Sequence, residues 1–319
     1  MKIVGLDSLI FAVDNLEDCA QYLIDYGLEP VAQTASGGRF EALDGTAIEL
    51  VSKAETDLPA APTEGCMLRK TLMGVADQET LVALTEELSK DREVRQLEDG
   101  SIETSDCFGF TLGFQVSVRK TPELVGEIAN APGSPVLRPV NHIGVETGER
   151  RIQPRTLSHV VYFVPDTEKA EAFYRDRLGF RTTDRFTGVG PFMQPAGTLD
   201  HHTHFFIPAP PFMTGVEHFT FHFAGPNEVI QNGHQFVEKG YQAFWGPGRH
   251  VFGSNWFWYF NSPFNCHMEM DADMDLHDTN WDAREAPLGA DASQAFLLGY
   301  RERWFPGPGA PEKGDYESA

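Results

Sequence analysis

Residues 157–179 read LSHVVYFVPDTEKAEAFYRDRLG. The apolar first part of this stretch, Leu157–Val164, predicts a β-strand, and Pro165-Asp166 then provides a cap for a helix over Thr167–Leu178 that ends at a glycine. Residues 6–27, LDSLIFAVDNLEDCAQYLIDYG, follow the same plan 151 positions earlier, with one residue fewer before the glycine. The sequence therefore contains an internal repeat whose unit begins with a strand and a helix.

Short β-rich runs follow each of these helices. Arg39–Leu43 and Ala47–Val51 flank an Asp-Gly pair, which is a hairpin signal. Two more units follow the same order, with helices predicted over Gln78–Lys90 and Asn227–Lys239. The sequence therefore predicts an α+β fold built from four βαβββ modules, each with a strand, a helix and about three further strands.

The chain of 319 residues is long enough for two domains. We predict a first pair of modules over 1–133, a proline- and glycine-rich linker over 134–155, and a second pair over 156–274. Residues 275–319 lie outside the repeats and are expected to form a tail or lid. All eleven histidines lie after residue 141, so histidine chemistry must reside in the second pair, and the first pair is expected to be degenerate and metal-free.

Composition limits the classes of partner. The formal net charge is −22, which argues against nucleic acid and against anionic membrane surfaces. No run of 18 apolar residues exists for a membrane span, and the start at Met1 lacks the apolar core of a signal peptide. The four cysteines have no paired spacing, which argues against a disulfide framework or a thiolate zinc site. A cytoplasmic protein is therefore expected.

Three residues on predicted strands form a candidate metal site: His159, His218 and Glu269. In a fold of paired repeats, equivalent strand positions converge on one cavity. Two imidazoles and one carboxylate form the facial triad that leaves three adjacent positions open on Fe(II). Taken alone, a histidine within an apolar strand is more often a hydrogen-bonded core residue, and Glu269 could belong to a solvated acidic edge.

A second constellation lies between two of these residues. Residues 246–250, GPGRH, read as a glycine-rich turn that delivers His250, and the aromatic strand Trp256–Phe260 follows it with Tyr259. The glycines alone could simply make turns, and the aromatic residues could simply fill a core. Together, however, a histidine, a tyrosine and a carboxylate can form a polar wall beside a metal.

From Leu157 to Asp271 the chain resembles the type I extradiol ring-cleavage dioxygenases of the vicinal oxygen chelate superfamily. The motif Gly-x-His…Tyr…Pro…Glu of that family stands here as Gly248-Arg249-His250, Tyr259, Pro263 and Glu269. The resemblance implies four βαβββ modules in two domains, with a metal only in the second. It implies that His159, His218 and Glu269 bind Fe(II), with Mn(II) as the alternative. Ser8 stands where the first half would need a histidine.

The resemblance also implies catalytic roles. A histidine about 14 residues before His218 would shuttle a proton, and this spacing selects His204, with His202 as the rival on the same strand face. His250 would hydrogen-bond a substrate hydroxylate. Tyr259 would donate a hydrogen bond to oxygen during ring opening.

The implied function is Fe(II)-dependent extradiol cleavage of a catechol with O2, in aromatic-compound degradation, by a homo-oligomer. The alternatives are a hydroquinone-cleaving dioxygenase, a glyoxalase-like isomerase or thiol transferase, and a metal-free drug-binding protein on the same modules. We expect a neutral, hydrophobically substituted catechol, because the segments predicted to line the pocket are aromatic; they contain Phe192, Met193, Trp245, Trp256, Phe257 and Trp258. Arg249 is near in sequence, and Arg301 or Arg303 could instead bind a carboxylate arm.

Overall fold

The computed structural model describes residues 1–55, 57–145 and 150–299. The first module comprises β1 (Ile3–Val13), α1 (Leu16–Tyr26), β2 (Glu29–Thr34), β3 (Gly37–Glu41) and β4 (Ala47–Ser52). The second comprises β5 (Leu68–Val75), α2 (Gln78–Leu88), β6 (Arg95–Gln96), β7 (Ile102–Ser105) and β8 (Thr111–Val116).

The second half repeats this order. The third module comprises β9 (Thr156–Val164), α3 (Thr167–Leu178), β10 (Arg181–Thr187), β11 (Gly190–Gln194) and β12 (His204–Pro208). A short 3-10 helix, η1 (Pro211–Met213), leads to the fourth module, which comprises β13 (Gly215–His222), α4 (Pro226–Glu238), β14 (Ala243–His250), β15 (Trp256–Asn261) and β16 (His267–Ala272). The predicted α+β fold of four βαβββ modules is confirmed.

Helix boundaries follow the local capping signals. Asn15 accepts a hydrogen bond from the backbone N–H of Asp18, and Asp166 does the same for Lys169. Gly27 and Gly179 end the two helices in the left-handed conformation, which glycine adopts without steric cost. Both helices therefore begin and end where the repeat predicts.

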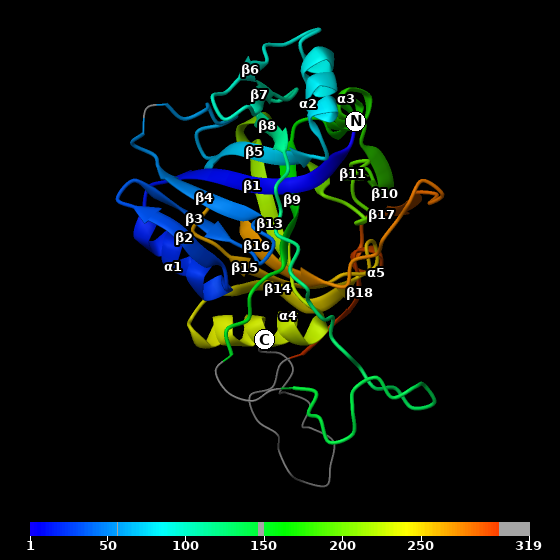
Figure 1. The fold of residues 1–319 in the computed structure, drawn as a ribbon. Helices are drawn as coiled ribbons and strands as arrows, with labels where there is room; N and C mark the ends of the chain where they lie inside the picture. The colour runs from blue at the N-terminus through cyan, green and yellow to red at the C-terminus, as the bar shows by residue number, and fades with distance from the viewer. Residues whose placement is uncertain (56, 146–149, 300–319) are drawn as a thin grey trace.

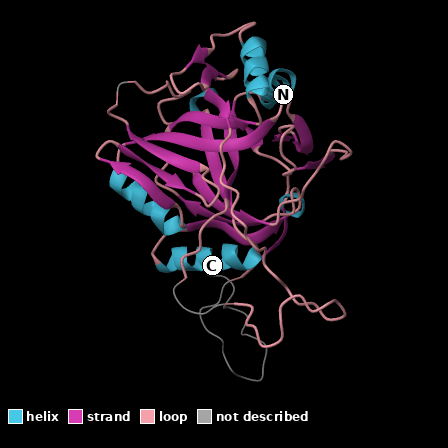
Figure 2. Ribbon diagram, in the orientation of Figure 1, coloured by secondary structure: helices cyan, strands magenta, loops and turns pink. Residues whose placement is uncertain are grey.

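Each pair of modules forms one sheet. The first sheet has the order β2-β3-β4-β1-β5-β8-β7-β6. The second sheet also includes β17 (Arg284–Pro287) and β18 (Gln294–Leu297), and its order is β17-β10-β11-β12-β9-β13-β16-β15-β14-β18. The opening strands of each pair run antiparallel at the centre, β1 beside β5 and β9 beside β13. Helices cover the outside of the sheets, with α1 against α4 and α2 against α3 (Figure 1, Figure 2). The predicted boundaries of the two domains stay a prediction.

The segment after residue 274 extends the second sheet at both edges. β17 (Arg284–Pro287) pairs in parallel with β10, and β18 (Gln294–Leu297) pairs with β14 after the short helix α5 (Ala290–Ser293).

Residues 246–250 are predicted to be a turn, but they belong to β14. The pairing of β14 with β15 has a bulge between Trp245 and Gly248. Gly248 allows β14 to pack closely against β18, because a Cβ at this position would lie 2.6 Å from the carbonyl oxygen of Phe296. Among the described residues, no helix has the length and apolar character needed to cross a membrane.

The first half packs against the back of the second sheet through α1. The Tyr26 hydroxyl donates a 2.5 Å hydrogen bond to the carbonyl oxygen of Glu269, and both residues are fully buried. Thr71 and Tyr162 make a second buried contact between the halves, 2.6 Å between their hydroxyls. The position of β16 therefore depends on a helix from the first module.

We expect Tyr26→Phe to lower the free energy of unfolding by about 1 kcal/mol, the usual net worth of one hydrogen bond. The loss stays small because the Glu269 carbonyl keeps a second donor, the Thr220 hydroxyl. Urea unfolding measures the change. The control is Tyr22→Phe in the same helix, where the removed hydroxyl is buried without a partner. An equal loss of unfolding free energy in both variants would contradict a stabilising role for the hydrogen bond from Tyr26 to the Glu269 carbonyl.

Candidate metal centre

Strand register places the candidate ligands side by side. Thr220 on β13 pairs with His159 on β9 on one side and with Glu269 on β16 on the other. His218 lies two residues before Thr220 and so projects from the same face of β13. Glu269 in turn pairs with Tyr259 on β15. One row across four neighbouring strands therefore carries most of the polar groups of the site.

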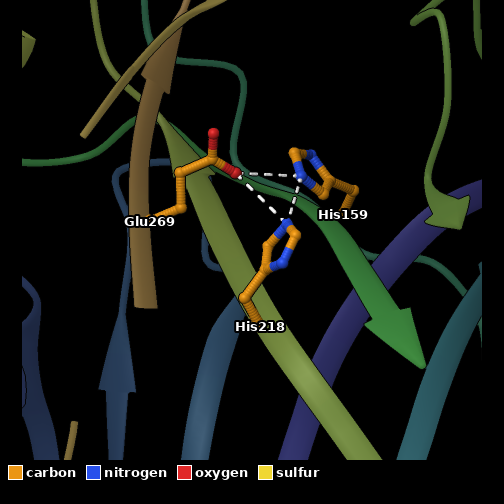
Figure 3. A group of neighbouring side chains, drawn as sticks. All are labelled: His159, His218 and Glu269. Carbon is orange, nitrogen blue, oxygen red and sulfur yellow. Dashed lines mark hydrogen bonds and ion pairs between the residues drawn. The ribbon is translucent and has the colours of Figure 1, made fainter. Parts of the chain in front are cut away.

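The ligand atoms converge on one point (Figure 3). His159 Nε2 lies 3.1 Å from Glu269 Oε2 and 3.3 Å from His218 Nε2, and the third separation, His218 Nε2 to Glu269 Oε2, is 3.5 Å. Ligands about 2.1 Å from a metal and at right angles to one another lie about 3.0 Å apart. The three side chains therefore fit a single divalent ion.

The charge of the site also fits a cation. Glu269 is fully buried, and its Oε1 atom has no hydrogen-bond partner. The other carboxylate oxygen, Oε2, accepts a 2.8 Å hydrogen bond from the Thr220 hydroxyl, so the protein supplies few donors to this carboxylate. Burial lowers the pKa of His159, so this ring stays neutral, the form that binds metals.

Neighbouring side chains orient both imidazoles. Ser158 Oγ lies 2.9 Å from His159 Nδ1, and Glu217 accepts a hydrogen bond from His218 Nδ1. His267 Nδ1 lies 2.9 Å from the other oxygen of Glu217, and these two histidines hold its pKa at about 2 although burial raises it. Each imidazole thus presents Nε2 to the site, as is usual for metal-binding histidines.

The sequence prediction missed Glu217. Neighbouring residues on a regular strand point to opposite faces, but β13 has a bulge between Val216 and His218 in its pairing with β9. The bulge brings Glu217 and His218 to the same side. A one-residue bulge leaves no sequence signal that alternation alone would detect.

A cavity of about 280 Å³ opens over the site. Most of its wall is apolar, and no lysine or arginine is among the described residues that form it. The apolar residues are Val161, Phe186, Val189, Phe192, Phe205, Ile207, Phe244, Trp245, Phe252 and Leu288. The polar residues are His159, His202, Glu217, His218, His250, Asn255, Tyr259 and Ser293.

Two of the predicted catalytic residues line this cavity. His250 Nδ1 lies 2.9 Å from the carbonyl oxygen of Ser293, to which it donates a hydrogen bond, so Nε2 of the neutral ring is an acceptor. The Tyr259 hydroxyl lies 3.4 Å from that Nε2. Burial, then the nearby charge of Glu269, raises the pKa of Tyr259 well above its ordinary value. Tyr259 therefore remains a hydrogen-bond donor.

The structure does not bring His204 to the cavity, so its predicted location is wrong. His204 pairs with Val160, not with His159, and its ring packs among Tyr162, Tyr174 and Phe180 on the opposite face. Its surroundings lower its pKa to about 3, mainly by burial. The alternation argument failed because β12 begins only at His204, and the chain before it is irregular.

His202, the rival in the sequence, lines the cavity instead. Its ring centroid lies 4.3 Å from that of His159 and 4.9 Å from that of Phe192. Burial lowers its pKa well below the ordinary value.

The aromatic prediction is right for Phe192 and Trp245 and wrong for four other residues: Met193, Trp256, Phe257 and Trp258. Arg249 pairs with Asp273, 2.8 Å away, and does not line the cavity. Arg301 and Arg303 lie outside the described residues. The prediction missed four aromatic residues of the cavity wall. Phe186 and Phe205 come from strands of the third module, whereas Phe244 lies on β14 and Phe252 follows that strand.

Parts of this chain are similar in sequence to known proteins. Residues 156–270 match the model of the Glyoxalase/Bleomycin resistance protein/Dioxygenase superfamily. Over 131 residues the chain is 39% identical to Metapyrocatechase 2 of Cupriavidus necator, a match that covers 41% of this chain and 40% of that protein. The resemblance to extradiol dioxygenases is thereby confirmed.

Solved structures share the whole architecture. The Mn(II)-bound glyoxalase of Novosphingobium aromaticivorans has a TM-score of 0.71 at 18% identity, covering 93% of this chain and 92% of that chain. The 2,2',3-trihydroxybiphenyl 1,2-dioxygenase of Sphingomonas wittichii has a TM-score of 0.70 at 19% identity, covering 94% and 100%. Enzymes named for different reactions thus share this fold equally, so the chemistry must be argued from the site.

We expect His218→Ala to abolish tight metal binding and Glu217→Gln to weaken it about 10- to 100-fold, because Glu217 only orients the ligand. Titration of the metal-free protein with Mn(II), followed by electron paramagnetic resonance, measures both. Glu103→Gln is the matched control, since Glu103 is a buried glutamate of the first sheet with its own cationic partners. Full metal binding by His218→Ala would refute the site.

Proposed function

We propose that this protein is an Fe(II)-dependent extradiol dioxygenase that cleaves the ring of a catechol with O2, incorporating both oxygen atoms. The observation that carries this proposal is one apolar cavity in which His202, His250 and Tyr259 face the group formed by His159, His218 and Glu269. Two imidazoles and a carboxylate with open adjacent positions are typical of non-haem Fe(II) oxygenases.

The ligand group would hold the metal, which when bound supplies Lewis acidity that favours a deprotonated catechol and offers adjacent positions for both reactants. The protein supplies the remaining chemistry. Ser158 and Glu217 keep the two imidazoles in one tautomer, and Thr220 Oγ1 donates a 2.8 Å hydrogen bond to Glu269 Oε2. These contacts pre-organise the site before substrate enters.

His250 and Tyr259 act on the substrate hydroxyls. Because His250 Nδ1–H is held by the Ser293 carbonyl, its Nε2 atom can accept a proton from a catechol hydroxyl and then hydrogen-bond the resulting hydroxylate. The Tyr259 hydroxyl, next to that nitrogen, donates a hydrogen bond toward developing negative charge on oxygen. His202, on the other wall, is placed to move a proton during ring opening.

The wall of the cavity favours an uncharged substituent. Phe186, Phe192 and Phe205 form a cluster with Phe252, and the rings of Phe192 and Phe205 stack 4.1 Å apart. Binding a carboxylate arm normally requires a cation such as a forked arginine. The proposed substrate is therefore an alkyl- or aryl-substituted catechol.

We also propose that the protein acts in the cytoplasm as a homo-oligomer. Its four cysteines are free, as is usual in a reducing compartment. Residues 117–145 form no helix or strand and expose several large aliphatic side chains, which is typical of an association surface; Val118, Val125, Val136, Leu137, Val140 and Ile143 are among them.

The test of the function uses protein loaded with Fe(II) without oxygen and then mixed with a methyl-substituted or a carboxymethyl-substituted catechol in air. We expect one O2 consumed per ring opened, both atoms of labelled O2 in the product by mass spectrometry, and at least a tenfold higher kcat/KM for the methyl compound. A tenfold preference corresponds to about 1.4 kcal/mol. No oxygen uptake with either catechol would refute the function, whereas a preference for the acid would refute only the apolar substrate.

His202→Asn and His204→Asn separate the two candidate histidines. We expect His202→Asn to retain iron but to lose about 10²- to 10⁴-fold in kcat, the scale of a positioned acid–base group. His204→Asn should lose little activity, because its ring lies on the far face of β12. Iron content by absorption spectroscopy and steady-state kinetics are the measurements. A larger loss of kcat in His204→Asn than in His202→Asn would identify His204 as the catalytic histidine.

A further inference from the structure

Building on the proposed function, we infer that Asp184 and His201 hold His202 in one tautomer, with its proton on Nδ1 and its Nε2 atom bare. Both are positioning residues, since neither Asp184 nor His201 lines the cavity among the described residues. They reach the reacting atoms only through His202.

A continuous hydrogen-bonded chain carries this inference. Asp184 Oδ2 lies 2.8 Å from His201 Nε2, and His201 Nδ1 lies 2.9 Å from His202 Nδ1. Asp184 and His201 have no exposed surface, and His202 is 4% exposed. Water therefore has little access to replace any link in the chain.

The negative charge of Asp184 determines which atom donates in each hydrogen bond between Asp184, His201 and His202. Arg284 on β17 donates to Asp184 from Nη2 at 2.5 Å, from Nε at 3.1 Å, and from its backbone N–H at 2.8 Å. These donors stabilise Asp184 as a carboxylate, which only accepts hydrogen bonds. His201 must then carry its proton on Nε2 in order to donate to Asp184.

The remaining link follows from the chemistry of a neutral imidazole. With its proton on Nε2, His201 presents a lone pair at Nδ1, so His202 Nδ1–H must donate across the 2.9 Å contact. This leaves Nε2 of His202 as the unprotonated nitrogen available to the substrate. A proton acceptor of fixed orientation therefore exists before substrate binds, as in other chains of a carboxylate and a histidine.

Strand pairing builds the chain from distant residues. Asp184 follows a bulge in the pairing of β10 with β11 and lies opposite Arg284 in the parallel pairing with β17. The guanidinium of Arg284 also lies 5.0 Å from the ring centres of Phe252 and Trp281. The segment after the repeats thus supports a side chain in the cavity wall.

The decisive variant is Asp184→Asn. Its amide N–H donates to His201 Nε2 and so reverses every hydrogen bond, which moves the His202 proton to Nε2. The position of the proton is read from ¹⁵N resonances of labelled histidine in full-length protein loaded with diamagnetic Zn(II), where bare and protonated ring nitrogens are well separated. The His202 signals are identified by their loss in His202→Asn.

We expect Nδ1 protonation in the unaltered chain and Nε2 protonation in Asp184→Asn. In the iron-loaded enzyme, kcat should fall about 10²- to 10⁴-fold, with iron content unchanged and KM for the catechol altered less than about threefold. Should this variant fail to fold, His201→Phe keeps an aromatic side chain but removes both the acceptor for His202 Nδ1–H and the donor to Asp184. It should lose about 10- to 100-fold in kcat, and its His202 should show both tautomers.

Asp7→Asn is the matched control. Asp7 is a buried aspartate of β1 that pairs with Arg119 and is not among the residues lining the cavity, so its loss should leave kcat and the His202 resonances unchanged. The inference is overturned if the His202 proton stays in place in Asp184→Asn, or if Asp7→Asn loses as much activity. If the unaltered enzyme cleaves no catechol, the proposed function fails, while the zinc measurement still decides the tautomer.

Discussion

A fully buried carboxylate, Glu269, imposes the strongest constraint on this protein. Taking an ionised group out of water costs several kcal/mol unless partners of opposite charge compensate it. Here a hydroxyl from Thr220 and imidazole nitrogens surround the carboxylate, and its Oε1 atom remains without a hydrogen bond. A divalent cation between the three ligand atoms would supply the missing compensation. Metal binding and the stability of the second sheet are therefore expected to be coupled.

The first half of the chain supports this carboxylate without sharing its chemistry. It lacks histidine altogether, and Ser8 stands at the position equivalent to His159. Yet α1 reaches across to the backbone of Glu269 through Tyr26, and Asn232 on α4 donates to the Tyr26 carbonyl in return. A degenerate copy can thus be retained because it fixes the back of the strand that carries the ligand.

The architecture could be predicted from the sequence because its signals are local. Capping residues and terminal glycines mark the helices, and the spacing of the repeat gives the number of modules. The grouping of His159, His218 and Glu269 followed from the family motif, and the strand register brings these residues side by side. Details that depend on irregular backbone could not be predicted. Because β12 begins only at His204, the residue that lines the cavity is His202 and not the predicted His204. The bulge in β13 brings Glu217 beside His218. The Asp184–Arg284 pair joins residues 100 positions apart, which no local pattern reveals.

The pairing of β17 and β18 with the two edges of the second sheet has a consequence for synthesis on the ribosome. Arg284, which holds Asp184, and Ser293, whose carbonyl holds His250, both belong to the last segment of the described chain. Contacts between residues so far apart in sequence form late, because a long loop must close first. The modules can fold as they emerge, but the cavity wall is finished only after residues 284–293 have left the ribosome. A nascent chain that lacks Arg284 and Ser293 therefore carries an incomplete cavity wall.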